Sequence, residues 1–353
     1  MSETREIVSS VEGTIGRIHL NNPGALNSLT NGMCATMLDL LTAWRDDDAI
    51  DAVVVTAEGD RAFCAGGDVR QVAAAGREDP VAARRFFQVE YAMDTAIAEF
   101  PKPYICLIDG IVMGGGLGIS VNGRYRVMGD NIMAAMPETG IGLLPDVGAT
   151  LFLNACPGRI GLYLGLTGAR LDTADALHAG FGTHHVPSGR HPALLEALTG
   201  AGFSGDRFAV VDGILGKFAS DPGASKLRAQ QADIDRLFSA DDMETIVATL
   251  QGDGSDLAAD ALAAFDHMSP TSLKMTARQI TENPDITIRD ALILEYRLVS
   301  QVLLRHDFYE GIRAALIDKD RNPQWQPATL AEVTPDYIDA HFESLGDQEL
   351  ALN

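Results

Sequence analysis

Two glycine-rich turns contain the first residues whose types and spacing could do chemistry. They are Phe63-Cys-Ala-Gly-Gly-Asp68 and Met113-Gly-Gly-Gly-Leu-Gly118, and each follows an apolar run typical of a buried strand. Because glycine lacks a Cβ atom, a ligand can approach the backbone, and an N–H group at a helix start has no partner within the helix. Two such groups aimed at one point would form an oxyanion hole for a developing alkoxide or enolate. Either turn could equally serve close backbone packing.

Two acidic residues follow in a segment that is otherwise mostly apolar. Glu138 and Asp146 are eight positions apart within Met136–Gly148, a stretch too rich in Gly and Pro for a regular helix. A carboxyl group in apolar surroundings has a raised pKa, which suits a base or a nucleophile near neutral pH. The alternative is a hydrogen-bonded acid that caps a helix or closes a turn.

Several common catalytic motifs are missing from the sequence. It contains no G-x-x-x-x-G-K-[ST], no H-E-x-x-H and no G-x-S-x-G, and the glycine cluster does not match G-x-G-x-x-G. Cleavage of nucleoside triphosphates, zinc-dependent hydrolysis and serine-nucleophile chemistry therefore lack their usual groups. The four cysteines are widely spaced, with no histidine beside them at zinc-ligand spacing, so we expect reduced thiols and no metal site.

Composition narrows the class of protein further. The chain has 353 residues, of which 46% are hydrophobic, so it can bury a substantial core and is expected to form about two domains. With 27 Lys and Arg against 49 Asp and Glu, the net charge is −22 and no basic run is present, which argues against nucleic-acid binding. No run of about 18 apolar residues and no leader-like start occur, so we expect a cytoplasmic protein without a membrane partner.

The order of the expected elements divides the chain near residue 190. Residues 1–190 alternate β-branched runs with amphipathic stretches, an α/β pattern with a hairpin about Glu12-Gly13. Thr30 is placed to cap a helix with one buried face. Residues 191–353 instead show successive helical patterns. The expected strands are Glu6–Val11, Thr14–Leu20, Ala52–Thr56 and Tyr104–Ile108, and the expected later helices are Ala193–Leu198, Lys226–Phe238, Met243–Leu250, Asp256–His267, Pro270–Ile280 and Ile288–Leu304.

The two turns, with Met136-Pro-Glu138 after them and Asn22-Pro-Gly-Ala-Leu-Asn27 before them, resemble the crotonase (enoyl-CoA hydratase/isomerase) superfamily. Further motifs resemble its 3-hydroxyisobutyryl-CoA hydrolase subfamily, and together they cover nearly the whole chain. These motifs are Phe86–Tyr91, Pro137–Gly148, Met268–Lys274, Glu295-Tyr-Arg297, His306–Arg313 and Leu316–Asp320. The resemblance implies a crotonase-type α/β spiral of ββα turns, carrying the site on residues 1–190, and a helical C-terminal region that covers the site or makes subunit contacts.

The resemblance also implies roles for individual residues. Gly67 and Gly115 match the positions whose backbone N–H groups hold the thioester oxygen. Glu138 matches the catalytic glutamate, Asp146 the hydrolase-type aspartate and Glu90 a further acid that contacts the substrate. The other expected substrate-binding residues are Ala25, Ala62, Ala65, Asp68 and Arg70. Coenzyme A would be part of the substrate, so no separate cofactor is expected.

One departure from the hydratase pattern concerns residue 118. Enoyl-CoA hydratases have a second catalytic glutamate just after the glycine run, where this chain has Gly118. The resemblance therefore predicts hydrolysis of a short 3-hydroxyacyl-CoA, with 3-hydroxyisobutyryl-CoA of valine breakdown as the first choice, by an enzyme that could be a homo-oligomer. Two alternatives stay open. An enoyl-CoA hydratase or isomerase could work with Glu138 alone, and a non-catalytic CoA-binding or scaffold protein could retain the fold.

Overall fold

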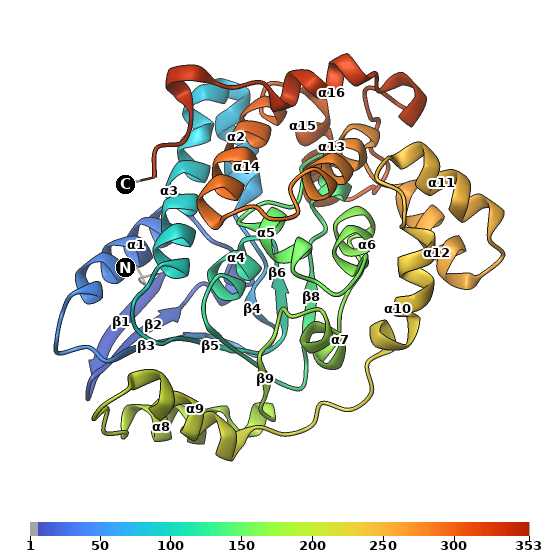
Figure 1. Ribbon diagram of the computed structural model, residues 1–353. Helices are drawn as coiled ribbons and strands as arrows, with labels where there is room; N and C mark the ends of the chain where they lie inside the picture. Colours follow the sequence, from blue (N-terminus) through green and yellow to red (C-terminus); the bar gives the residue numbers. More distant parts are fainter. Residues whose placement is uncertain (1–5, 353) are drawn as a thin grey trace. The chain divides into compact units, whose positions relative to one another are not determined.

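The computed structural model describes residues 6–352 (Figure 1). By its internal contacts the chain forms two compact units. Each unit combines three separate segments of the chain. The first, called unit 1, contains residues 6–67, Ala92–Ala134 and Arg170–Lys226. The second, unit 2, contains Asp68–Tyr91, Ala135–Ala169 and residues 227–352.

Nine strands and sixteen α-helices are assigned within the described residues. The strands are β1 (Ile7–Glu12), β2 (Ile15–Leu20), β3 (Ala52–Ala57), β4 (Ala62–Cys64), β5 (Tyr104–Ile108), β6 (Ile111–Met113), β7 (Tyr125–Met128), β8 (Met133–Ala135) and β9 (His184–His185). The helices of the first half are α1 (Asn31–Arg45), α2 (Val69–Glu78), α3 (Pro80–Ala98), α4 (Gly115–Val121), α5 (Ala149–Asn154), α6 (Ile160–Thr167) and α7 (Thr173–His178). The later ones are α8 (His191–Thr199), α9 (Arg207–Phe218), α10 (Lys226–Leu237), α11 (Met243–Gly252), α12 (Asp256–Phe265), α13 (Pro270–Thr281), α14 (Ile288–Val302), α15 (His306–Ile312) and α16 (Pro335–Phe342).

The main sheet of unit 1 has the strand order β1-β2-β3-β5-β7-β9. β1 and β2 form the expected antiparallel hairpin, with Glu12 opposite Ile15, and the remaining neighbours are parallel. All of β5 and the first four residues of β3 are buried, as their continuous apolar runs predict for central parallel strands. Thr30 caps α1 as expected, because its side chain accepts a hydrogen bond from Met33 N.

A second, three-stranded sheet has the order β4-β6-β8. Each of its strands directly follows one strand of the main sheet, in the pairs β3–β4, β5–β6 and β7–β8, and helices follow each pair. This alternation is the repeated ββα turn that the resemblance predicts. It brings the loops after β4 and β6 to neighbouring positions, because β4 and β6 are paired in parallel.

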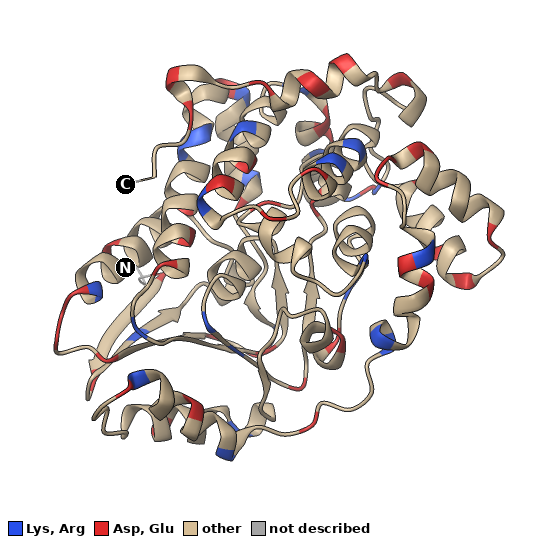
Figure 2. Cartoon of the chain, viewed as in Figure 1, with Lys and Arg blue, Asp and Glu red and all other residues tan. Residues whose placement is uncertain are grey.

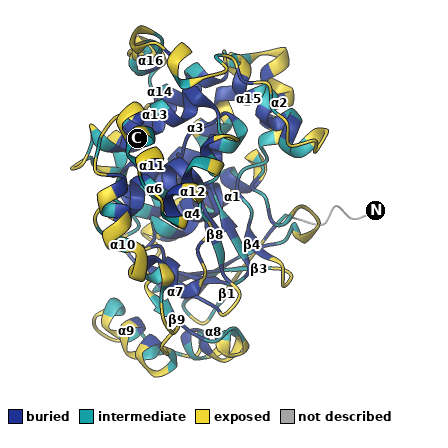
Figure 3. Cartoon of the chain, turned by 90° about the vertical axis from the view of Figure 1, so that its right-hand side faces the viewer, coloured by how far each residue is buried: buried dark blue, intermediate teal, exposed yellow. Residues whose placement is uncertain are grey.

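Helices α8 and α9 pack against one face of the main sheet, where they lie beneath it in Figure 1. Leu194, Leu198, Val211 and Leu215 point from these helices into a core shared with the strands. Buried and exposed faces alternate on both helices, as Figure 3 shows by colour. Apolar residues at helical spacing therefore explain why this pair covers the sheet.

Unit 2 is built around α13 and α14. Helix α13 contacts α5, α6 and α11, while α14 contacts α5 and α16. Most residues of both helices are buried (Figure 3). In Figure 2, Lys and Arg are scattered singly among Asp and Glu over the helices.

The contact-defined units do not follow a single boundary near residue 190, since both contain residues from before and after that point. All regular elements among described residues after 190 are helices, as the sequence predicts, and the six expected segments coincide with α8 and α10–α14. The assignment of the substrate site to residues 1–190, and of a covering or subunit-contact role to residues 191–353, stays a prediction.

Candidate active site

The two glycine turns lie together in unit 1. A Cβ atom built on Gly66 would be 3.2 Å from Met113 O and 3.7 Å from Gly115 N, so the first turn touches the second. Gly66 has a φ of 104°, a conformation that favours glycine. The two predicted oxyanion donors, Gly67 and Gly115, therefore belong to turns that are in contact.

The second turn shows that packing and chemistry can use adjacent glycines. Gly115 is the first residue of α4, so its N–H has no acceptor within the helix. A Cβ atom on Gly116, in contrast, would overlap the carbonyl of Cys64. Gly116 thus has a packing reason to be glycine, whereas the donor role of Gly115 stays a prediction.

The loop Asn22–Asn27 is tied to the first turn through Asn27, which is almost fully buried. The Asn27 Nδ2 group donates to Glu58 O and to Ala62 O, each at 3.0 Å. Ala65 N donates to Leu26 O at 3.0 Å. Ala62 and Ala65 are therefore held beside this loop, where Ala25 is exposed.

Three predicted acids occur in unit 2, and all three are buried. Glu90 lies on α3, Glu138 begins the short 3-10 helix η2 (Glu138–Ile141), and Asp146 lies in the loop before α5. They are 2%, 6% and 5% exposed, respectively. Tyr91 donates its hydroxyl proton to Asp146 Oδ2 at 2.7 Å. One oxygen of Glu90 and one of Glu138 have no hydrogen-bond partner among the described residues.

The pKa values of these acids are raised by their surroundings. Burial raises the pKa of Glu138, and the charge of Asp146 raises it further. Burial also raises the pKa of Glu90, with added contributions from Asp146 and Glu138. For Asp146, burial raises the pKa to about 6, although the Tyr91 hydrogen bond opposes the shift. Asp146 can therefore exchange protons near neutral pH, whereas an exposed carboxyl group with its ordinary pKa stays ionised there.

The turn that carries Glu138 is held by α15. A Cβ atom on Gly142 would overlap the carbonyl of Asp307, and one on Gly311 would overlap Ile141. Gly142 also has a φ of 70°. These close approaches of the backbone fix η2 against the helix and explain why the segment is rich in glycine.

The remaining predicted residues, Asp68 and Arg70, lie at the start of α2 in unit 2. Asp68 caps this helix, since its carboxylate accepts hydrogen bonds from Gln71 N at 3.2 Å and from Gln71 Nε2 at 2.6 Å. Arg70 is exposed. Their contacts with a substrate stay predictions.

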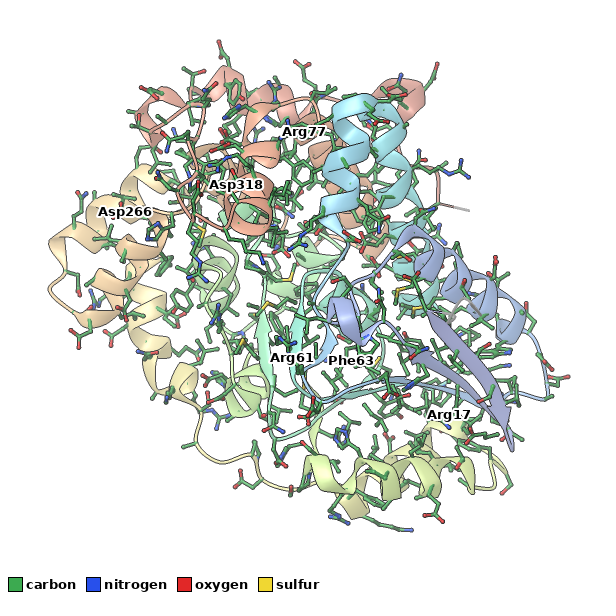
Figure 4. All side chains as sticks on the ribbon, turned by 180° about the vertical axis from the view of Figure 1, so that it is seen from behind. Arg17, Arg61, Phe63, Arg77, Asp266 and Asp318 are labelled. Atoms are coloured by element: carbon green, nitrogen blue, oxygen red, sulfur yellow. The ribbon has the colours of Figure 1, made fainter. Side chains whose placement is uncertain are left out.

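Sequence reasoning passed over three residues that the structure brings forward. Tyr91 contacts Asp146, and its position directly after Glu90 was the available signal. Glu295 bonds to the segment after Asp146, and only its place in a subfamily motif pointed to it. Arg61 immediately precedes β4 in unit 1, beside Ala62, and is exposed (Figure 4).

Within residues 6–352, no three His, Cys, Asp or Glu side chains are grouped so that they could hold a metal ion. No helix of this part of the chain combines the length and apolar character needed to span a bilayer. The four cysteines are buried, and no disulfide occurs among the described residues.

Comparison with known families gives one model, described as enoyl-CoA hydratase/isomerase, that matches residues 15–342. Among curated relatives, the mitochondrial 3-hydroxyisobutyryl-CoA hydrolase of Xenopus tropicalis is 44% identical over 98% of this chain and 91% of its own length. The human protein of the same name is 41% identical over 98% of this chain and 90% of its own length. The predicted family is confirmed.

Solved structures confirm the predicted fold class. A structure described as a carnitinyl-CoA dehydratase from Mycobacterium thermoresistibile has a TM-score of 0.92 and 39% identity, and the match covers 99% of both chains. An enoyl-CoA hydratase from Rhodobacter sphaeroides has a TM-score of 0.91 and 39% identity, with 98% of this chain and 100% of that chain covered.

The expectation of a cytoplasmic location is wrong. The hydrolases similar to this chain are named as mitochondrial proteins in frog, chicken and human. The expectation depended on reduced thiols and on the polar, acidic character of the first residues. Buried thiols do not distinguish one reducing compartment from another, so they carried no information on this point.

Proposed function

The chain belongs to the enoyl-CoA hydratase/isomerase family, and on this premise we propose that it hydrolyses a short 3-hydroxyacyl-CoA thioester. The first choice of substrate is 3-hydroxyisobutyryl-CoA, an intermediate of valine breakdown, because the curated relatives named above carry that activity in their names. The observation that carries the proposal is the group of three buried acids, Glu90, Glu138 and Asp146, with raised pKa values.

The proposed reaction assigns the polarising groups to unit 1. The N–H groups of Gly67 and Gly115 would donate to the thioester oxygen and stabilise the negative charge that develops on it. Coenzyme A is part of the substrate, and Ala25, Ala62 and Ala65 are the proposed backbone contacts for it. Arg70 of the prediction, and Arg61 in addition, are the candidate cations for the phosphates of coenzyme A, and Asp68 is a predicted polar contact.

The three buried acids are proposed to supply the attack. In one route, a Glu138 oxygen bonds to the carbonyl carbon, the C–S bond breaks, and water then hydrolyses the resulting anhydride. In the other route, Glu138 takes a proton from water, the hydroxide attacks, and the thiolate leaves and receives a proton. Asp146 and Glu90 would bind the 3-hydroxyl group or the water. A raised pKa makes the ionised Glu138 carboxylate a stronger nucleophile in the first route and a stronger base in the second.

The test is the release of free thiol from a panel of acyl-CoA and 3-hydroxyacyl-CoA esters, together with the hydration of crotonyl-CoA. We expect release from 3-hydroxyisobutyryl-CoA and much slower hydration, because Gly118 stands where hydratases have a second glutamate. Rapid hydration without thiol release would instead support a hydratase, as the descriptions of the two similar structures suggest. Binding of coenzyme A with neither reaction would indicate a non-catalytic protein.

A variant of Glu138 tests its assigned role. Glu138→Gln keeps the size of the side chain and removes its charge, so kcat should collapse while binding of the CoA ester persists. Glu282→Gln is the matched control, because Glu282 is an exposed acid of the same unit, paired with Arg278. Wild-type kcat in Glu138→Gln would show that the carboxylate has another role.

Whether the protein forms a homo-oligomer is a separate proposal. The helices after residue 190 would supply the subunit contacts. Sedimentation of the purified chain measures the state directly, and a monomer at all concentrations would exclude this role for them.

A further inference from the structure

The loop Pro145–Thr150, here called the Asp146 loop, is held on both sides of Asp146 by side chains that are far away in the sequence. Glu295 on α14 accepts hydrogen bonds from Gly148 N at 2.7 Å, Thr150 N at 2.8 Å and Thr150 Oγ1 at 2.7 Å. On the other side, Gln279 on α13 donates through Nε2 to Pro145 O at 2.7 Å. The same Nε2 group lies 2.8 Å from Thr150 Oγ1.

The backbone of the Asp146 loop needs such support. Val147 has a φ of 57° and Gly148 a φ of 90°. A β-branched residue at positive φ is strained and persists only where the surroundings hold it in place. Within the loop, Ala149 N donates a hydrogen bond to Asp146 O at 3.0 Å. The three bonds to Glu295 hold the segment directly after Asp146.

Glu295 also replaces the missing cap of α5. Gly148 is the N-cap residue of this helix and has no side chain to offer. The Glu295 carboxylate meets N–H groups of the first turn, where an anion is stabilised by the helix dipole. Its own burial is complete, and burial raises its pKa to about 8, against the hydrogen bonds from Thr150 and Gly148. Placing a buried acid here is costly, so a role beyond capping is expected.

We propose that Glu295 is a positioning residue, which acts through the Asp146 loop to hold the Asp146 carboxylate in its place beside Tyr91. This inference rests on the proposed function, since it concerns the geometry of the proposed reaction. Asp146 is the charged group that acts on Glu295, and Tyr91 is influenced by both acids. Glu295 itself touches the loop and not the reacting atoms.

The direct variant is Glu295→Gln. The amide can accept from one side only, and its NH₂ group would then oppose an N–H donor of the loop. We expect the loop to shift and to displace the Asp146 carboxylate. This displacement should lower kcat by about 10²-fold with little change in KM, because small displacements of a reacting group have effects of that size. Thr150→Val is a milder second variant, which removes only the hydroxyl bonded to Glu295 and Gln279.

A double-mutant cycle separates positioning from general stabilisation. If Glu295 acts through Asp146, Glu295→Gln should change kcat less than about two-fold when Asp146 is already Asn. An equal loss in both backgrounds would overturn the inference. Asp235→Asn is the control, because Asp235 accepts a hydrogen bond from Arg159 N at 2.7 Å, at the start of α6, a helix without any candidate residue. That variant should lower Tm and leave kcat unchanged.

The design distinguishes failure of the inference from failure of the proposed function. If the wild-type chain releases no thiol from any ester of the panel, the proposed function fails. The same cycle is then measured on the free energy of unfolding at pH 4 and pH 8. If Glu295 positions Asp146, the effect of Asp146→Asn on the free energy of unfolding should differ less between pH 4 and pH 8 in the Glu295→Gln background than in the wild type. Effects of the two substitutions that simply add at both pH values would overturn the inference.

Discussion

The Asp146 carboxyl group should lower the stability of the protein at neutral pH. Its pKa is raised from 3.8 to about 6 by burial. A carboxyl group whose pKa is higher in the folded state stays protonated to a higher pH there than in the unfolded state. The stability that this group contributes is therefore present below about pH 4 and is lost as the pH rises through about 6. Each pKa unit of difference is worth about 1.4 kcal/mol, which gives a cost of about 3 kcal/mol at pH 8.

Asp146→Asn removes this cost and keeps an acceptor for the Tyr91 hydroxyl. The difference in free energy of unfolding, variant minus wild type, should therefore rise by about 2–3 kcal/mol from pH 4 to pH 8. Denaturant titrations at the two pH values measure this gain. The two tryptophans are Trp44 in unit 1 and Trp325 in unit 2. A Trp44→Phe background therefore makes fluorescence report on the unit that contains Asp146.

The control for this experiment is Asp130→Asn. Hydrogen bonds with His185 and Ser188 lower the pKa of Asp130, so the stability that Asp130 contributes is present above about pH 4 and is lost only at lower pH. Asp130→Asn should therefore lose a similar amount of stability at pH 4 and at pH 8. If Asp146→Asn instead loses at least as much stability at pH 8 as at pH 4, the site stabilises the ionised acid. The reasoning from burial to a reactive carboxylate would then be refuted.

Local chemistry made part of the fold predictable from the sequence. Continuous apolar runs identified β3 and β5, because a parallel strand covered on both faces has no need for alternation. Thr30 identified the start of α1 because a hydroxyl oxygen can bond to an N–H group that has no partner in the first turn. Helix α9 was missed, since Gly213 and Gly216 interrupt its pattern.

Contacts between distant segments were not predictable in this way. Glu295 lies 149 positions after Asp146, and no spacing rule connects an acid on one helix with the loop before another. The raised pKa of Glu138 was foreseen from its apolar neighbours, but the part due to Asp146 depends on tertiary structure. For Asp68 the sequence leaves two roles open, because an aspartate suits both a helix cap and a substrate contact. Only the structure shows that it caps α2.

Two further predictions concern the reaction itself. Tyr91→Phe removes a 2.7 Å hydrogen bond that lowers the pKa of Asp146. Hydrogen bonds to a charged group contribute about 1.5–3 kcal/mol. The acid limb of the pH profile of kcat/KM should therefore move up by about one to two pH units. An unmoved limb would separate Asp146 from the reaction. Gly115→Val should lower kcat by about 10²–10³-fold, because a side chain displaces the carbonyl from its donor, and should leave binding of free coenzyme A unchanged. Gly116→Ala is the comparison, since its Cβ atom would overlap Cys64 O and should mainly lower Tm. A Gly115→Val enzyme that is destabilised yet fully active would show that this glycine, too, serves packing.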